Sequence, residues 1–168
     1  MTAAVFLVFS LTLFLDLLLR SHGIASVFTA FGIFYYTAVL GWKTGLLLAL
    51  AAAVPAAVFS GSPFPFELIV YPAVAGLSLW NLYRCGRGAS ESGGHLISGA
   101  LIPVLVFVPG ALAASREALL MFLIRLLPLC TVSALLLPAF LFLLDLSAGK
   151  LALPLYADAI RQREGTFR

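Results

Sequence analysis

Residues 41–60 of the chain read GWKTGLLLALAAAVPAAVFS, the most regularly patterned stretch of the sequence. Small side chains recur in it at every fourth position: Gly41, Gly45, Ala49, Ala53 and Ala57. Because residues four apart lie on one face of a helix, the spacing predicts an apolar helix with a smooth ridge. Small-residue ridges let helices approach closely inside a bilayer, so we interpret this one as a packing or partner interface. The alternative is that alanine is simply common in membrane helices.

The composition around this stretch is that of a membrane protein. The chain has 168 residues, of which 62% are hydrophobic and 10% are charged, with a mean hydropathy of +1.11. Soluble domains average about 45–50% apolar and about 25% charged residues, so a water-soluble enzyme is excluded. A spanning helix takes about 20 apolar residues. We therefore expect an all-α polytopic membrane protein, a bundle of about six transmembrane helices, with residues 1–168 forming one integral membrane domain.

The apolar stretches and the turn signals between them place the spans. We expect a turn at residues 60–65, where glycine and two prolines cluster, and the longest internal loop at residues 84–95. The last apolar stretch is too long for one perpendicular crossing, so it should tilt, break at Pro128 or Pro138, or extend past the bilayer. The predicted spans are residues 3–19, 24–40, 44–59, 66–83, 96–114 and 119–146, followed by a short cytoplasmic tail, residues 150–168.

The basic residues predict how the chain is oriented. A formal charge of +3 and a pI of about 9.1 would suggest nucleic acid in a soluble chain, but at this hydropathy we expect no nucleic-acid binding. An even number of spans puts both termini on one side. If that side is the cytoplasm, Arg20 and Arg116 lie outside, and the cytoplasmic set is Lys43, Arg84, Arg87, Lys150, Arg161, Arg163 and Arg168. This positive-inside bias predicts cytoplasmic N- and C-termini.

Few ionisable residues fall within the spans, and these are the candidates for function. Asp16 and Arg20 are four apart and can pair on one helix face. The pair either faces the bundle as a polar site or lies at the interface, with Arg20 reaching the headgroups. Glu67 follows the turn at residues 60–65, where it could bind a ligand, pair with Arg20, or simply be an interfacial acid exposed to water.

Arg125 lies about two turns into the last predicted span, where its donors need acceptors. Asp16 and Glu67 are the available carboxylates, and an internal pair, a partner or lipid contact, and small-molecule binding all stay open. Asp145, near the other end of this span, is expected at the interface.

No pattern in the sequence indicates catalysis. His22 and His95 are isolated, and we expect both to be solvated; Cys85 and Cys130 have neither disulfide-framework nor zinc-site spacing. The sequence also has no nucleophile–base pair and no phosphate-binding loop. We therefore expect no enzyme activity, no metal and no cofactor.

Part of the sequence resembles a known family. The resemblance is carried by residues 41–50 (GWKTGLLLAL), by the Ser-Gly-Ser-Pro turn at 60–63, and by a following helix that ends at Tyr83 in a basic loop. In these parts the chain is similar to the MreD-type rod shape-determining membrane proteins. Family members often carry an acid shortly before this turn, where this chain has Ala57. The resemblance implies a non-catalytic scaffold of the cell-elongation machinery in the bacterial inner membrane. Its implied partners are the lipid bilayer, an MreC-type periplasmic protein and the elongation peptidoglycan synthases.

That family is similar in fold to the substrate-binding subunits of energy-coupling-factor vitamin transporters, which supplies the alternative function. Such subunits carry an Ala-x-x-x-Ala contact on their first helix, and Ala3 and Ala4 have no such partners here. A vitamin binder should have a preformed pocket, whereas a scaffold should have a packed interior. The candidate pocket residues are Tyr35, Tyr36, Glu67, Tyr71 and Arg125.

Overall fold

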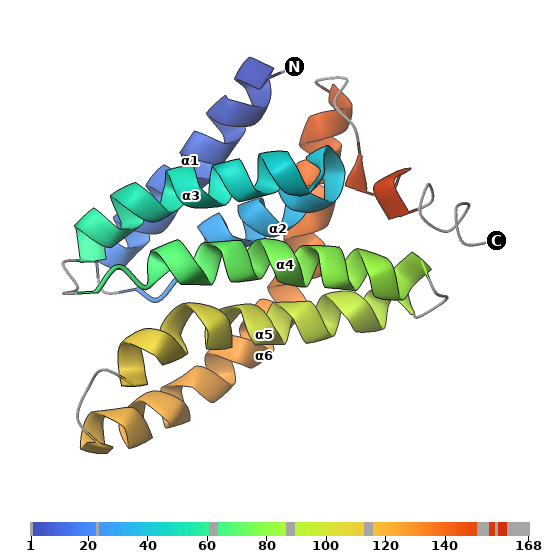
Figure 1. The fold of residues 1–168 in the computed structure, drawn as a ribbon. Coiled ribbons are helices and arrows are strands. Elements are labelled where there is room, and N and C mark those ends of the chain that lie inside the picture. Colours follow the sequence, from blue (N-terminus) through green and yellow to red (C-terminus); the bar gives the residue numbers. More distant parts are fainter. Residues whose placement is uncertain are drawn as a thin grey trace.

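The computed structural model describes residues 2–22, 24–60, 64–86, 90–112, 116–150, 155–156 and 158–160. Over this part of the chain the fold is all-α, as predicted (Figure 1). The helices are α1 (Thr2–Ser21), α2 (Phe28–Leu40), α3 (Trp42–Ser60), α4 (Glu67–Gly86), α5 (Glu91–Leu112) and α6 (Arg116–Lys150). Three segments of them are long and apolar enough to cross a membrane, namely Trp42–Ser60, Ser92–Pro109 and Leu126–Lys150.

The bounds predicted for the loop at residues 84–95 are wrong, because α4 continues to Gly86 and α5 begins at Glu91. Ser90 explains the early start of α5. Its hydroxyl accepts a hydrogen bond from the Gly93 amide at 3.4 Å, and its carbonyl accepts one from the Gly94 amide at 3.0 Å. A serine in this place satisfies amide groups that the first helical turn leaves without partners, and this offsets the low helix propensity of the two glycines.

The long helix α6 is continuous through both of its prolines. It has 35 residues, and Pro128 and Pro138 lie inside it without ending it. At 1.5 Å per residue such a helix is about 50 Å long, more than the roughly 30 Å of a hydrocarbon core. Figure 1 shows that α6 changes direction along its length, first following α5 and then turning toward α2. The excess length is therefore accommodated by a bend and not by a break.

The helix around which the others pack is α2, not the small-residue helix α3. All ten residues from Thr29 to Ala38 are buried, and α2 contacts each of the other five helices. It has only 13 residues, about 20 Å of helix. A helix that is apolar all round and surrounded by others packs against protein on every side. Figure 1 shows α2 behind α3 and α4, inside the bundle.

The small-residue ridge of α3 packs against other helices of the same chain. Gly45, Ala49 and Ala53 are buried, while Gly41 and Ala57 at its two ends are half-buried. At Gly45 the neighbouring helix α2 is so close that an added Cβ would lie 2.7 Å from the Cα of Thr37. The ridge therefore permits close packing of α3 on α2.

Gly41 makes the tight connection between these two helices. Its φ of +88° is a conformation that side chains other than glycine rarely adopt, and its amide donates to the Thr37 carbonyl at 3.1 Å. The chain thus ends α2 and begins α3 within one residue.

Replacing Gly45 with alanine should destabilise the protein, because the new methyl group would overlap the α2 backbone. We expect Gly45→Ala to lower the unfolding free energy by about 1–3 kcal/mol, the usual cost of overpacking. Gly76→Ala on α4 is the matched control, since a Cβ there meets nothing within 4 Å. It should leave stability unchanged or raise it by up to about 1 kcal/mol through helix propensity. Thermal unfolding in mild detergent measures both; equal behaviour of the two variants would contradict the close approach.

Candidate functional site

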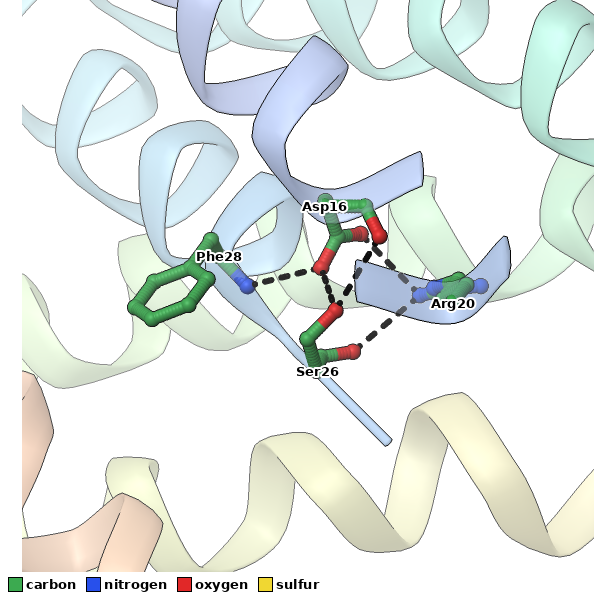
Figure 2. Close-up of polar contacts among 4 residues, drawn as sticks. All are labelled: Asp16, Arg20, Ser26 and Phe28. Atoms are coloured by element: carbon green, nitrogen blue, oxygen red, sulfur yellow. Dashed lines mark hydrogen bonds and ion pairs between the residues drawn. The ribbon is translucent and has the colours of Figure 1, made fainter. Parts of the chain in front are cut away.

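A buried carboxylate joins α1 to the start of α2. Asp16 is fully buried, and Figure 2 shows it directed at the segment that precedes α2. The Ser26 hydroxyl donates to Asp16 Oδ1, and the Phe28 amide donates to the same oxygen at 3.2 Å. This one side chain therefore fixes the path of the connection between the two helices.

The Asp16 carboxylate also serves as the cap that α2 lacks in its own sequence. The residue at the cap position, Val27, has no side-chain oxygen, and it makes no side-chain cap hydrogen bond. Asp16 accepts from Phe28, the first residue of α2, and thereby satisfies one free amide. Its negative charge at the positive end of the helix dipole adds to the stabilisation.

Arg20 extends this cluster by one helical turn. Its Nη2 atom lies 3.2 Å from Asp16 Oδ2 and donates to the Ser26 carbonyl at 3.3 Å (Figure 2). The guanidinium also lies 5.9 Å from the centre of the Phe107 ring on α5. Of the two interpretations left open by the sequence, the structure favours the polar site that faces the bundle, because the Asp16 side chain is 1% exposed and that of Arg20 only 19%.

A pocket of about 220 Å³ opens beside the pair, and it is partly open to the outside. Four helices contribute to it: α1 through Arg20, α3 through its last residue Ser60, α4 through Glu67 and α5 through Phe107. The full lining is Arg20, Ser60, Phe66, Glu67, Val70, Tyr71, Val106 and Phe107. The structure thus brings Arg20 into one pocket with Glu67 and Tyr71, two of the predicted pocket residues.

Three buried polar atoms in the pocket wall lack a hydrogen-bond partner among the described residues. They are Nε of Arg20, Oε2 of Glu67 and the hydroxyl of Tyr71. Tyr71 is buried, and it lies close enough to Arg20, Asp16 and Glu67 to interact electrostatically with them. A buried polar atom without a partner costs about 1–3 kcal/mol, so this wall is suited to a polar molecule that supplies the missing bonds.

The hypotheses about Arg125 concern its side chain. Its backbone belongs to α6, but its side chain lies outside the described residues. The carboxylate of Asp16, one of its two candidate mates, is already bound by Arg20, Ser26 and Phe28.

A second polar cluster lies toward the other end of α4. Asp145 Oδ1 accepts hydrogen bonds from the Tyr35 hydroxyl and from the Tyr156 amide, both at 2.7 Å. The Tyr156 hydroxyl lies 3.1 Å from Nε2 of His95 and accepts from Nδ2 of Asn81 at 3.3 Å. The expectation that His95 is solvated is therefore wrong, since it is 8% exposed and packed against this tyrosine.

The second cluster includes residues from the C-terminal part of the chain. In the predicted cytoplasmic tail, residues 150–168, Tyr156 and Ile160 are buried in the core. Asp145, predicted to lie at the interface, is half-buried and bonded within the chain. Tyr35 belongs to this cluster and, like Tyr36, does not line the pocket.

The described residues hold no group of three or more His, Cys, Asp or Glu side chains that could bind a metal ion, and no disulfide joins Cys85 to Cys130. In comparisons with known proteins, no family model, no curated protein and no solved structure matches this chain. Over the described residues, fold and composition define a class, an all-α protein with three helices able to span a membrane.

Removing the Asp16 carboxylate should destabilise the fold in a graded way. Asp16→Ala leaves the Arg20 charge without its carboxylate and the Phe28 amide without its acceptor, and we expect a loss of about 3–5 kcal/mol of unfolding free energy. Asp16→Asn keeps an oxygen that can accept from Phe28 and should lose less. Asp158→Ala, at an exposed carboxylate, is the control. Unfolding in a denaturing-detergent titration measures all three; a loss for Asp16→Ala no larger than the control would contradict the capping role.

Proposed function

We propose that the chain is a non-catalytic membrane scaffold of the bacterial cell-elongation machinery, as its resemblance to the MreD-type proteins implies. The observation that carries the proposal is the packed centre of the bundle. A scaffold acts through its surfaces and needs no interior cavity, whereas a substrate carrier needs a preformed one.

The packing around α2 supports this proposal. Phe31, Ile33 and Phe34 are fully buried, and Phe31 contacts the Phe140 ring of α6 with ring centres 5.6 Å apart. Tyr35 stacks on Tyr156 with ring centres 6.1 Å apart. Large side chains thus fill the centre of the bundle, and their packing there stabilises the fold.

The outward surface of α1 is the best candidate for a partner helix. Leu7, Leu11 and Phe14 are 66%, 63% and 64% exposed, and with Leu18 they follow the spacing of one helix face. We call these four residues the α1 stripe. Because the ridge of α3 already packs against the chain's own helices, a partner helix needs another apolar face. Inside a bilayer, helices associate through side-chain packing.

The distribution of basic and aromatic residues supports an orientation with cytoplasmic termini. Lys43 lies over Trp42 at the start of α3, and Arg84 lies over Trp80 near the end of α4. Since α3 and α4 are consecutive helices that lie side by side and run in opposite directions (Figure 1), these pairs mark one end of the bundle. Tryptophan favours the headgroup level and basic residues the cytoplasmic side. The Asp16–Arg20 end would then face the periplasm, where an MreC-type partner would approach.

A second candidate, a substrate-binding subunit of an energy-coupling-factor importer, is favoured by the pocket. Two of the expected pocket residues, Glu67 and Tyr71, do line it. Tyr35 does not, since its hydroxyl donates to Asp145. The pocket also lies at an end of the bundle and not at its centre, so the scaffold remains the better-supported function.

Co-purification from the native membrane tests the choice. The tagged chain, extracted in mild detergent, should retain an MreC-type protein or an elongation synthase, identified by mass spectrometry. Double replacement of Leu11 and Phe14 by alanine in the α1 stripe should reduce that recovery about tenfold or more, as truncation of central contacts does.

The matched control replaces Leu47 and Val54 by alanine, two exposed positions on α3. It should leave the recovery unchanged. Recovery of paired ATPases with a coupling membrane subunit would overturn the scaffold in favour of import, and equal effects of the two double variants would remove the α1 stripe as the contact.

A further inference from the structure

We infer that the pocket beside Asp16 and Arg20 binds the headgroup of a zwitterionic phospholipid, with a primary ammonium group at Glu67 and a phosphate at Arg20. The shared chemistry is a phosphoethanolamine group, carried by a lipid or free in water. The depth of the pocket, its unused donors and acceptors, and its shape each point to this ligand.

The depth of the pocket matches that of a headgroup. Ser60, in its wall, is the last residue of α3, whose whole length is one of the candidate spans. Glu67 is the first residue of α4, and Arg20 lies in the last turn of α1. If α3 crosses the bilayer, all three lie at its end, where hydrocarbon gives way to the polar region.

The Glu67 side of the pocket is suited to an ammonium group. Oε2 of Glu67 and the hydroxyl of Tyr71 are buried acceptors without a hydrogen-bond partner in the described part of the chain. Asp16, Arg20 and Glu67 together carry two acidic groups and one basic group, so the site has an excess of negative charge. Phe66 and Phe107 add aromatic rings to the same wall, and ring faces attract cations.

The Arg20 side is suited to a phosphate. Nη2 of Arg20 is already used by Asp16 and by the Ser26 carbonyl, which fixes the guanidinium in place. Its Nε is buried without a partner among the described residues. A guanidinium held in this way offers its remaining N–H groups to phosphate oxygens without losing further side-chain freedom.

The shape of the pocket favours a lipid over a free headgroup. It is partly open, has a volume of about 220 Å³, and includes the apolar side chains Val70 and Val106 beside the polar wall. Apolar lining next to two polar anchor points is the usual form of a site for an amphipathic ligand. Acyl chains attached to the headgroup could then run along the outside of the bundle.

Native mass spectrometry of the full chain tests this inference. The protein in mild detergent is offered equal amounts of phosphatidylethanolamine, phosphatidylglycerol and phosphatidylcholine with identical acyl chains. We expect retention of phosphatidylethanolamine over each of the others by at least about tenfold, the effect of one hydrogen bond to a charged group. Equal retention of phosphatidylglycerol or of phosphatidylcholine would overturn the assignment of a primary ammonium site.

Two variants locate the site. Glu67→Gln and Tyr71→Phe should each bring the preference for phosphatidylethanolamine close to one, whereas Asp158→Asn and Tyr83→Phe, at exposed positions, should retain it. Each replacement is nearly isosteric, and circular dichroism checks that the helices remain. A preference that survives both pocket variants would place the lipid elsewhere and overturn the proposal.

A third arm separates the two sources of the headgroup. Free phosphoethanolamine is added to the protein that holds the lipid. No displacement at millimolar concentration supports a lipid ligand, whereas complete displacement would overturn the lipid in favour of the soluble group.

Discussion

The hydrogen bonds of the Asp16 carboxylate to Ser26 and Phe28 are the interaction on which the rest of the structure depends. They hold the start of α2, and α2 contacts every other helix from α1 to α6. Without this external cap, the first turn of a buried helix would have an unsatisfied amide in an apolar surrounding. The same carboxylate holds Arg20, so the core helix and the pocket wall share one support.

The apolar core and the polar clusters therefore occupy different parts of the helix bundle. Its middle is filled by the apolar and aromatic side chains of α2, while polar groups gather toward the two ends. One end has the pocket with its unused donors and acceptors; the other has Asp145, His95 and Tyr156 in a bonded cluster. A packed middle supports the proposed scaffold, and the polar pocket is where we propose that a lipid headgroup binds.

The helices and the Asp16–Arg20 pair could be predicted from the sequence, because apolar runs and a spacing of four are local signals. The burial of Asp16 could not, since an exposed pair has the same spacing. The role of α2 was hidden because hydropathy does not distinguish a helix surrounded by lipid from one surrounded by protein. His95 and Tyr156 are separated by 61 residues, and the pocket joins four helices, so only the fold brings them together.

The most direct test of this account is the exchange rate of the Phe28 amide proton, followed by NMR in protein labelled with ¹⁵N-phenylalanine and assigned with Phe28→Leu. If Asp16 caps α2, the Phe28 amide exchanges slowly, and its exchange accelerates selectively in Asp16→Ala while that of Phe34 in the middle of α2 changes less. Fast exchange of Phe28 in the unaltered protein, or a rate that does not depend on Asp16, would contradict the claim that this carboxylate holds the central helix.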